Sequence, residues 1–118
     1  MRYQFYDDTK YFITYSAENR GIVLTDIEKQ IIKKHLLAAA AEWSVEVEVF
    51  AICHNHLHAI INAGEQYARK MFLKSLAGRS SRELNLLNKR SGTFWETYYA
   101  DGIFNEKSYY NIFSYILG

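Results

Sequence analysis

The pattern of hydrophobic and polar positions along this chain predicts strands and helices in alternation. Residues 10–16 are rich in β-branched and aromatic side chains, which are typical of a first strand. Thr25 and Glu28 have the spacing of a capping box, so we expect a helix from there to about Glu42. The residues that this helix should bury are Ile27, Ile31, Leu36, Ala38 and Ala39.

The middle of the chain predicts two neighbouring strands. Valines alternate with glutamates at the start of residues 45–52, so one face of the first part of this strand should be exposed to solvent. Both faces should be apolar in its later part. A second strand, residues 57–62, follows after a tight connection, and we expect it to pair with the first in an antiparallel manner. On this second strand Leu57, Ala59 and Ile61 should point toward a core.

Two further helices are predicted after these strands. Residues 66–76 have helical composition, and Gly78 is placed to end that helix as its C′ residue. Ser80 and Glu83 have the spacing of a second capping box, so a separate short helix should begin there and end before Ser91. The side chains of the first of these helices that are available for burial are Tyr67, Phe72, Leu73 and Leu76.

The chain is predicted to finish with an extended segment and a last helix. An aromatic cluster at 94–99 leads to residues 102–104, which we expect to be a strand or extended. Asn105 can cap a helix that starts at Glu106. The whole order predicts an α+β, ferredoxin-like (RRM-like) antiparallel sheet with helices on one face, plus a C-terminal helix.

Length and composition favour one domain over residues 1–118, without repeats or linkers. The longest apolar runs are too short for a membrane helix, so no membrane partner is expected. Residues 1–8 lack the apolar region of a secretory signal, and Cys53 is the only cysteine, which agrees with a reducing compartment. We therefore expect a cytoplasmic protein.

The positive charge of the chain is concentrated in one segment, although the formal net charge is only +1. Between residues 69 and 90 the only acidic residue is Glu83. The basic residues of this segment are Arg69, Lys70, Lys74, Arg79, Arg82, Lys89 and Arg90. Such a stretch is typical of a phosphate-binding surface, and the plain alternative is a solvated helix face.

His56 and His58 are the first candidates for chemistry. Residues two apart on a strand point to the same face, so the two imidazoles should lie side by side. Together they can supply part of the shell of a divalent metal ion, and a third group must complete it. The plain alternative is a packed or solvated histidine pair. His54 can either reach the same face or lie on the surface.

Tyr115 is the second candidate. At about 100° per residue it falls beside the apolar stripe of the last helix, at the edge of a core, where its hydroxyl can point into a cleft. An amphipathic boundary tyrosine is the plain alternative. The stripe that should pack on the sheet contains Tyr109, Ile112, Phe113 and Ile116. Spacing alone does not separate Tyr115 from the other tyrosines nearby.

Five segments in register resemble the HUH single-tyrosine transposases, especially the REP-associated tyrosine transposase branch. They are residues 11–15 with Asn19, Arg20, Leu24 and Thr25; residues 55–61; residues 72–76 with 81–85; residues 94–96 with 98–101 and Ile103; and residues 114–116. The resemblance covers nearly the entire chain in the right order.

The resemblance implies metal-dependent nicking and strand transfer of single-stranded or hairpin DNA during DNA transposition. His56 and His58 would hold Mg²⁺ or Mn²⁺, which acts as a Lewis acid on the scissile phosphate. Tyr115 would form a covalent 5′-phosphotyrosine intermediate and release a 3′-hydroxyl. The basic residues between 69 and 90 would bind the DNA backbone, and exposed aromatic side chains would stack unpaired bases.

The sequence departs from the pattern of that family in two places. Cys53 and His54 stand where the family usually has Met-Pro. The family commonly takes a third metal ligand one helical turn beyond the tyrosine, whereas this sequence ends at Gly118. The sequence is therefore truncated, or another residue such as His54 or Glu48 substitutes, or the site is impaired. Some relatives exchange the tyrosine helix in a homodimer and others work alone, and both arrangements stay open.

Three other functions remain to be weighed. A domesticated family member would bind hairpin DNA without cutting it. An RRM-like RNA binder would share the ferredoxin-like architecture, but the histidine strand lacks the aromatic-rich platform of those domains. A small zinc-dependent hydrolase would need a third histidine or acid at a recognised spacing, and no such spacing is present.

Overall fold

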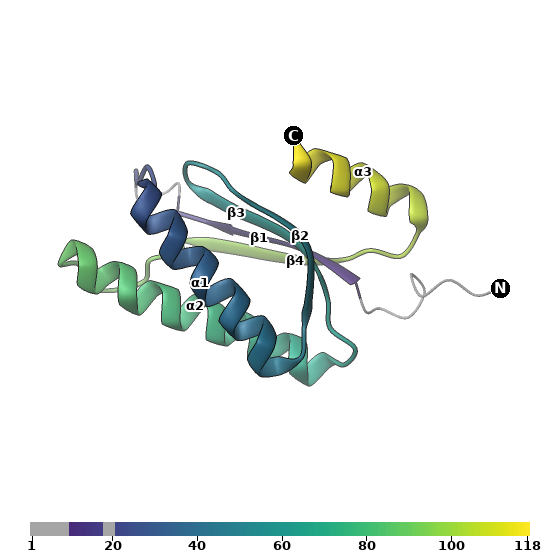
Figure 1. Ribbon diagram of the computed structural model, residues 1–118, viewed down its shortest axis with the longest axis horizontal. Helices are drawn as coiled ribbons and strands as arrows, with labels where there is room; N and C mark the ends of the chain where they lie inside the picture. Colours follow the sequence, from purple (N-terminus) through teal and green to yellow (C-terminus); the bar gives the residue numbers. More distant parts are fainter. Residues whose placement is uncertain (1–9, 18–20) are drawn as a thin grey trace.

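The computed structural model describes residues 10–17 and 21–118. A four-stranded antiparallel sheet lies between two layers of helices, with α1 and α2 on one face and α3 on the other (Figure 1). The elements are β1 (Lys10–Ser16), α1 (Asp26–Trp43), β2 (Glu46–Ile52), β3 (His56–Asn62), α2 (Gln66–Asn88), β4 (Thr97–Gly102) and α3 (Glu106–Leu117). Residues 1–8, Asn19 and Arg20, which entered the sequence analysis, lie outside the described residues.

The sheet has the strand order β2-β3-β1-β4, and all neighbouring strands are antiparallel. This order and the β-α-β-β-α-β-α succession confirm the predicted ferredoxin-like α+β fold with an added C-terminal helix. The histidine strand β3 is hydrogen-bonded to β2 on one side and to β1 on the other. Its backbone is therefore held from both sides.

Two hydrophobic cores form on the two faces of the sheet. Leu57, Ala59 and Ile61 of β3 are buried under α1 and α2, as the alternation of the strand predicts. Ile60 points the other way and is buried with Ile103 and Ile116 beneath α3. Tyr109, Ile112 and Phe113 pack against this second core, which confirms the predicted stripe.

A β-bulge in β2 changes which face its side chains occupy. The pairing with β3 shifts register between Val47 and Val49, so Glu48 is the extra residue. Val47 packs in the core under α1 and α2, whereas Val49 packs in the core under α3. Simple alternation would have placed both valines on one face, so the bulge is what moves Val49 to the face under α3.

Helix α1 begins with the predicted capping box: Thr25 accepts from the Glu28 amide, and the Glu28 carboxylate accepts from the Thr25 amide. The prediction that Ile27 and Ala38 are buried is wrong, since both are exposed. Glu28 is buried instead and also accepts a hydrogen bond from Asn88. The residues of α1 that reach the core are Ile32, Leu36, Ala39 and Ala40.

Helix α2 is one continuous helix, so the two separate helices predicted around Gly78 are wrong. The buried positions Phe72, Leu73, Leu76, Ser80 and Leu84 repeat every three or four residues across that glycine. Packing of this face on the sheet and on α1 overrides the local stop signal. Tyr67 was available for burial by its position in the sequence, but its side chain is exposed at the start of the helix.

The sequence predicted Ser80 as the N-cap of a separate helix, and this is wrong. Ser80 is an internal residue of α2. Its hydroxyl donates to the carbonyl of Leu76 at 2.6 Å and accepts from the indole N–H of Trp95 at 3.0 Å. Trp95 is therefore fixed to α2, although it lies in the segment before β4.

Strand β4 falls on residues 97–102, earlier than the predicted extended segment at 102–104. The chain then turns through Ile103 and Phe104 into α3. The side chain of Asn105 accepts from the Ser108 amide, which confirms the predicted cap of that helix. Among the residues described, no helix has the length and apolar character required to cross a bilayer.

Candidate active site

His56 and His58 lie on the sheet face that α3 partly covers. Their rings are stacked, with centroids 5.5 Å apart and an interplanar angle of 9°. Strand periodicity places them there, because positions 56, 58 and 60 share a face and Ile60 of the same face is buried under α3. The predicted side-by-side pair is therefore present in the structure.

Two residues of β1 orient the His58 ring. The Thr14 hydroxyl lies 3.1 Å from Nδ1 of His58, directly across the β1–β3 pairing. The Phe12 ring stacks on the same imidazole with centroids 5.9 Å apart. Because Nδ1 is engaged by Thr14, Nε2 is the nitrogen of His58 that can serve as a metal ligand.

The surroundings of His58 favour the neutral imidazole. Burial lowers the pKa of His58 below its ordinary value, and the neighbouring His56 lowers it further. A neutral imidazole is the form that binds metal ions. The environment of this histidine thus agrees with a ligand role at neutral pH.

Helix α3 places Tyr115 beside the histidine pair of the same chain. The Tyr115 ring stands edge-on to His58, with centroids 5.7 Å apart and an interplanar angle of 74°. Ile116 is buried in the core under α3, whereas Tyr115 is 65% exposed. The helix is therefore anchored next to the tyrosine, while the phenol itself remains open to a ligand.

The histidine pair fits a partial metal shell. Within residues 10–17 and 21–118, no group of three or more His, Cys, Asp or Glu side chains is placed to hold a metal ion. Neither alternative third ligand, His54 or Glu48, joins the pair, and both carboxylate oxygens of Glu48 are bonded elsewhere. A shell with only two protein ligands leaves coordination positions for waters and phosphate oxygens, which Mg²⁺ commonly keeps.

The predicted basic segment divides between different surfaces of α2. Arg69, Lys70 and Lys74 line a groove on the face of the sheet that α1 and α2 cover, opposite the histidines. Arg79 instead bonds to Glu42 of α1. Arg82 is exposed further along α2, and Lys89 and Arg90 lie at and just beyond its C-terminal end. The seven cations do not form one continuous patch around the histidines.

Comparisons with known proteins decide the family. The sequence model described as "Transposase IS200 like" matches residues 5–118. The chain belongs to the IS200-like transposase family. This membership confirms the resemblance stated from the sequence and assigns the chain to DNA-processing enzymes of DNA transposition. No curated protein matches the chain.

Two solved structures support the fold of this IS200-like transposase. A "putative transposase" from Deinococcus radiodurans R1 has a TM-score of 0.67 and 22% identity, over 92% of this chain and 88% of that one. A REP-associated tyrosine transposase bound to a REP hairpin also has a TM-score of 0.67, with 16% identity, over 92% of this chain. This chain spans 64% of the length of that second protein.

Sequence reasoning missed several residues that shape the two surfaces of this transposase. Thr14 and Phe12 contact His58, and the signal for them was their alternation on β1 opposite β3. Tyr98 and Trp95 line the groove beside α2. Their place depends on how β4 and its preceding loop pack against α2, which no local pattern of the sequence specifies.

Proposed function

We propose that this transposase-family chain cuts and rejoins single-stranded DNA with Tyr115 as its nucleophile. The observation that supports this most directly is the contact between Tyr115 and His58, whose ring centroids lie 5.7 Å apart beside His56. A phenol, two imidazoles and an open approach meet on one face of the sheet. The scissile phosphate would lie between the tyrosine and the histidine pair.

The reaction balances without a further energy source. The Tyr115 hydroxyl attacks phosphorus, the bond from phosphorus to the leaving 3′-oxygen breaks, and the phenolic proton is released while the 3′-oxygen gains a proton. The product is a 5′-phosphotyrosine link and a free 3′-hydroxyl. Because a phosphodiester bond is kept, a 3′-hydroxyl of another strand can later displace the tyrosine and rejoin the DNA.

His56 and His58 would hold a Mg²⁺ or Mn²⁺ ion, which supplies Lewis-acid stabilisation of charge on the phosphate oxygens. Thr14 and Phe12 keep the His58 ring in one orientation for this role. The burial of Ile116 in the core under α3 keeps the preceding Tyr115 beside the pair. Positioning of this kind lowers the entropy cost of bringing the nucleophile to a bound phosphate.

The proposed substrate is DNA that folds into a hairpin with single-stranded flanks. The related REP-associated transposase was solved with a REP hairpin, which supports the same class of partner here. Exposed lysines and arginines on α2 supply the positive charge that backbone binding requires.

The test is a covalent-trapping assay. A hairpin oligonucleotide from the DNA flanking the gene is incubated with the protein and Mn²⁺, and a denaturing gel is read for protein-linked DNA. The parent should form an adduct that needs metal, and Tyr115→Phe should form none. Tyr110→Phe is the matched control, since Tyr110 is an exposed tyrosine of the same helix. Adduct formation by Tyr115→Phe would overturn the assignment of the nucleophile.

A second candidate function is hairpin binding without cleavage. It is favoured by one observation: the described residues provide two histidines but no third ligand in a metal-holding group. The same oligonucleotide separates the two functions. Tight binding without an adduct at any Mn²⁺ concentration would support the binding protein, whereas a metal-dependent adduct would exclude it.

A further inference from the structure

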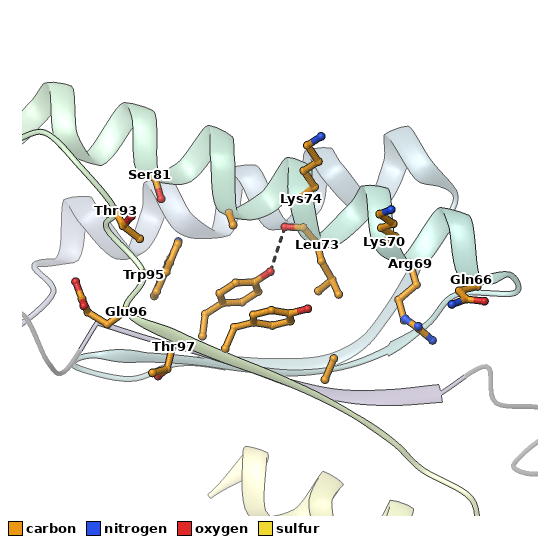
Figure 2. Close-up of a pocket in the computed structure, with 14 residues that line it drawn as sticks. Gln66, Arg69, Lys70, Leu73, Lys74, Ser81, Thr93, Trp95, Glu96 and Thr97 are labelled. Carbon is orange, nitrogen blue, oxygen red and sulfur yellow. Dashed lines mark hydrogen bonds between the residues drawn. The ribbon is translucent and has the colours of Figure 1, made fainter.

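A groove of about 590 Å³ lies between α2 and β4, on the face of the sheet that α1 and α2 cover (Figure 2). We call it the α2–β4 groove. It is lined from α2 by Gln66, Arg69, Lys70, Leu73, Lys74, Ala77 and Ser81, and from the sheet and the β4 approach by Tyr15, Thr93, Trp95, Glu96, Thr97, Tyr98 and Ala100. The histidine pair and Tyr115 lie on the opposite face of the sheet, so this groove is not part of the proposed active site.

The floor of the α2–β4 groove is a preformed aromatic platform. The Tyr98 ring stacks on the Tyr15 ring at a centroid distance of 5.2 Å and an interplanar angle of 16°. Tyr15 is buried, and its hydroxyl donates to the carbonyl of Leu73 at 3.1 Å. Tyr98 is nevertheless 53% exposed. A fixed and half-exposed ring of this kind offers its free surface for stacking.

Positive charge gathers at one end of the groove. Arg69 extends from α2 toward the sheet, where its guanidinium lies 4.1 Å from the centroid of the Tyr11 ring (Figure 2). Lys70 and Lys74 stand along the rim of the same helix (Figure 2). Glu96 lies at the opposite end, with Thr93 (Figure 2). The groove thus offers cationic side chains for an anionic group at one end and the Tyr98 ring for a flat aromatic group.

We propose that the α2–β4 groove binds an unpaired nucleotide of the DNA substrate, with its base stacked on Tyr98 and its phosphates beside Arg69, Lys70 and Lys74. The proposal rests on the DNA substrate of the proposed function, but it needs neither metal nor cleavage. The volume is in the range of sites that hold a small molecule, so the groove admits a single-stranded or extruded nucleotide and excludes a paired helix. Stacking on Tyr98 likewise requires a base whose face is free.

Strand β4 connects the groove with the catalytic face. It is an edge strand of the sheet, and Tyr98 and Tyr99 point to opposite faces of the sheet. Both rings are more than half exposed. A DNA strand that passes around this edge would contact Tyr98 on the groove side and Tyr99 on the side of the histidines. The groove would thus hold DNA next to the segment that is cut.

The experiment measures binding alone, in Tyr115→Phe protein without metal, so that it does not depend on cleavage. The probe is a short single strand that carries one 2-aminopurine, whose fluorescence falls when the base stacks. Tyr98→Ala should weaken binding about tenfold and abolish the quenching, whereas Tyr98→Phe should keep both. Lys74→Ala should reduce the slope of log affinity against log salt by about one, and Lys33→Ala, an exposed lysine of α1, should leave it unchanged.

The proposal is overturned if Tyr98→Ala and Lys74→Ala bind the probe as the parent does, with unchanged far-ultraviolet circular dichroism. It is also overturned if a duplex of the same sequence binds as tightly as the single strand and quenches equally. Lys74 is exposed, so its substitution tests the groove without a risk to folding. The binding experiment does not depend on cleavage. A negative result in the covalent-trapping assay would therefore contradict the proposed function but not the nucleotide-binding groove.

Discussion

The hydroxyl of Tyr109 donates a hydrogen bond of 2.6 Å to the carboxylate of Glu48, which ties α3 to β2. The second carboxylate oxygen of Glu48 accepts from the ammonium of Lys10 on β1 at 2.5 Å. Burial and the bond to Glu48 raise the pKa of Tyr109, so its hydroxyl stays protonated as a donor. The bulge in β2 thus provides an anchor for the helix that bears Tyr115, in place of the metal ligand considered from the sequence.

Tyr109→Phe should destabilise the protein by about 2 kcal/mol, because it removes a hydrogen bond to a charged and largely buried carboxylate. It should also slow formation of the tyrosine adduct, since α3 is less firmly held. Urea unfolding measures the first effect, and the initial rate of covalent trapping measures the second. Tyr110→Phe is the control for an exposed hydroxyl on α3. Equal stability of Tyr109→Phe and the parent would show that the bond does not anchor the helix.

Thr14→Val should weaken Mn²⁺ binding about tenfold while it leaves the fold intact. Valine keeps the shape of threonine but removes the hydroxyl at Nδ1 of His58, and the loss of such an outer partner typically costs about 10- to 100-fold in metal affinity. Titration followed by electron paramagnetic resonance of Mn²⁺ gives the dissociation constant. Thr97→Val, an exposed threonine of β4, is the control. Unchanged affinity in Thr14→Val would argue against His58 as a ligand through Nε2.

The sequence predicted the elements whose signals are local. The alternation in residues 10–16, the Thr25 capping box and the Asn105 cap appear in the structure as expected. Errors arose where packing over long distances decides the outcome. Glu48 at the bulge bonds to partners on β1 and α3, and the buried Glu28 of α1 bonds to Asn88 at the far end of α2.

Gly78 shows such an override most clearly, and its substitution tests it. The glycine lies on an exposed turn inside α2, and a Cβ built on it meets no atom within 4 Å. Gly78→Ala should therefore stabilise the protein by about 0.5–1 kcal/mol, because alanine loses less entropy in a helix. Thermal or urea unfolding of the variant and the parent gives the sign of this change in stability. A loss of stability would instead indicate a helix end with a left-handed glycine at this position.

The candidate site was predictable only in part. The His-apolar-His spacing is enough to place two imidazoles together on one strand. The approach of Tyr115 to His58 required the resemblance to a family, because it depends on how α3 packs on Ile60 and Ile103. The division of the basic segment between the groove and the salt bridge from Arg79 to Glu42 follows from the continuity of α2. Counting charges along the sequence reveals neither the cations that line the groove nor the one that pairs with Glu42.

Tyr15→Phe should change the response of stability to alkaline pH. Burial, and to a smaller extent Tyr98, raise the pKa of Tyr15 above the ordinary tyrosine value of 10.0. The folded state thus prefers the protonated phenol. The contribution of this group to stability is complete below about pH 10 and is lost as the pH rises further, since only the unfolded chain then ionises readily.

At pH 8 the Tyr15→Phe variant should be less stable than the parent by about 1 kcal/mol, because the hydrogen bond to the carbonyl of Leu73 is lost. Above pH 10 the parent loses stability through Tyr15 while the variant does not, so the difference should shrink. Urea unfolding of both proteins between pH 8 and 11 measures this difference, in which the other tyrosines largely cancel. A difference that stays constant or grows with pH would mean that Tyr15 ionises in the folded protein as readily as in the unfolded chain, and the platform beneath Tyr98 would then not be buried as the structure shows.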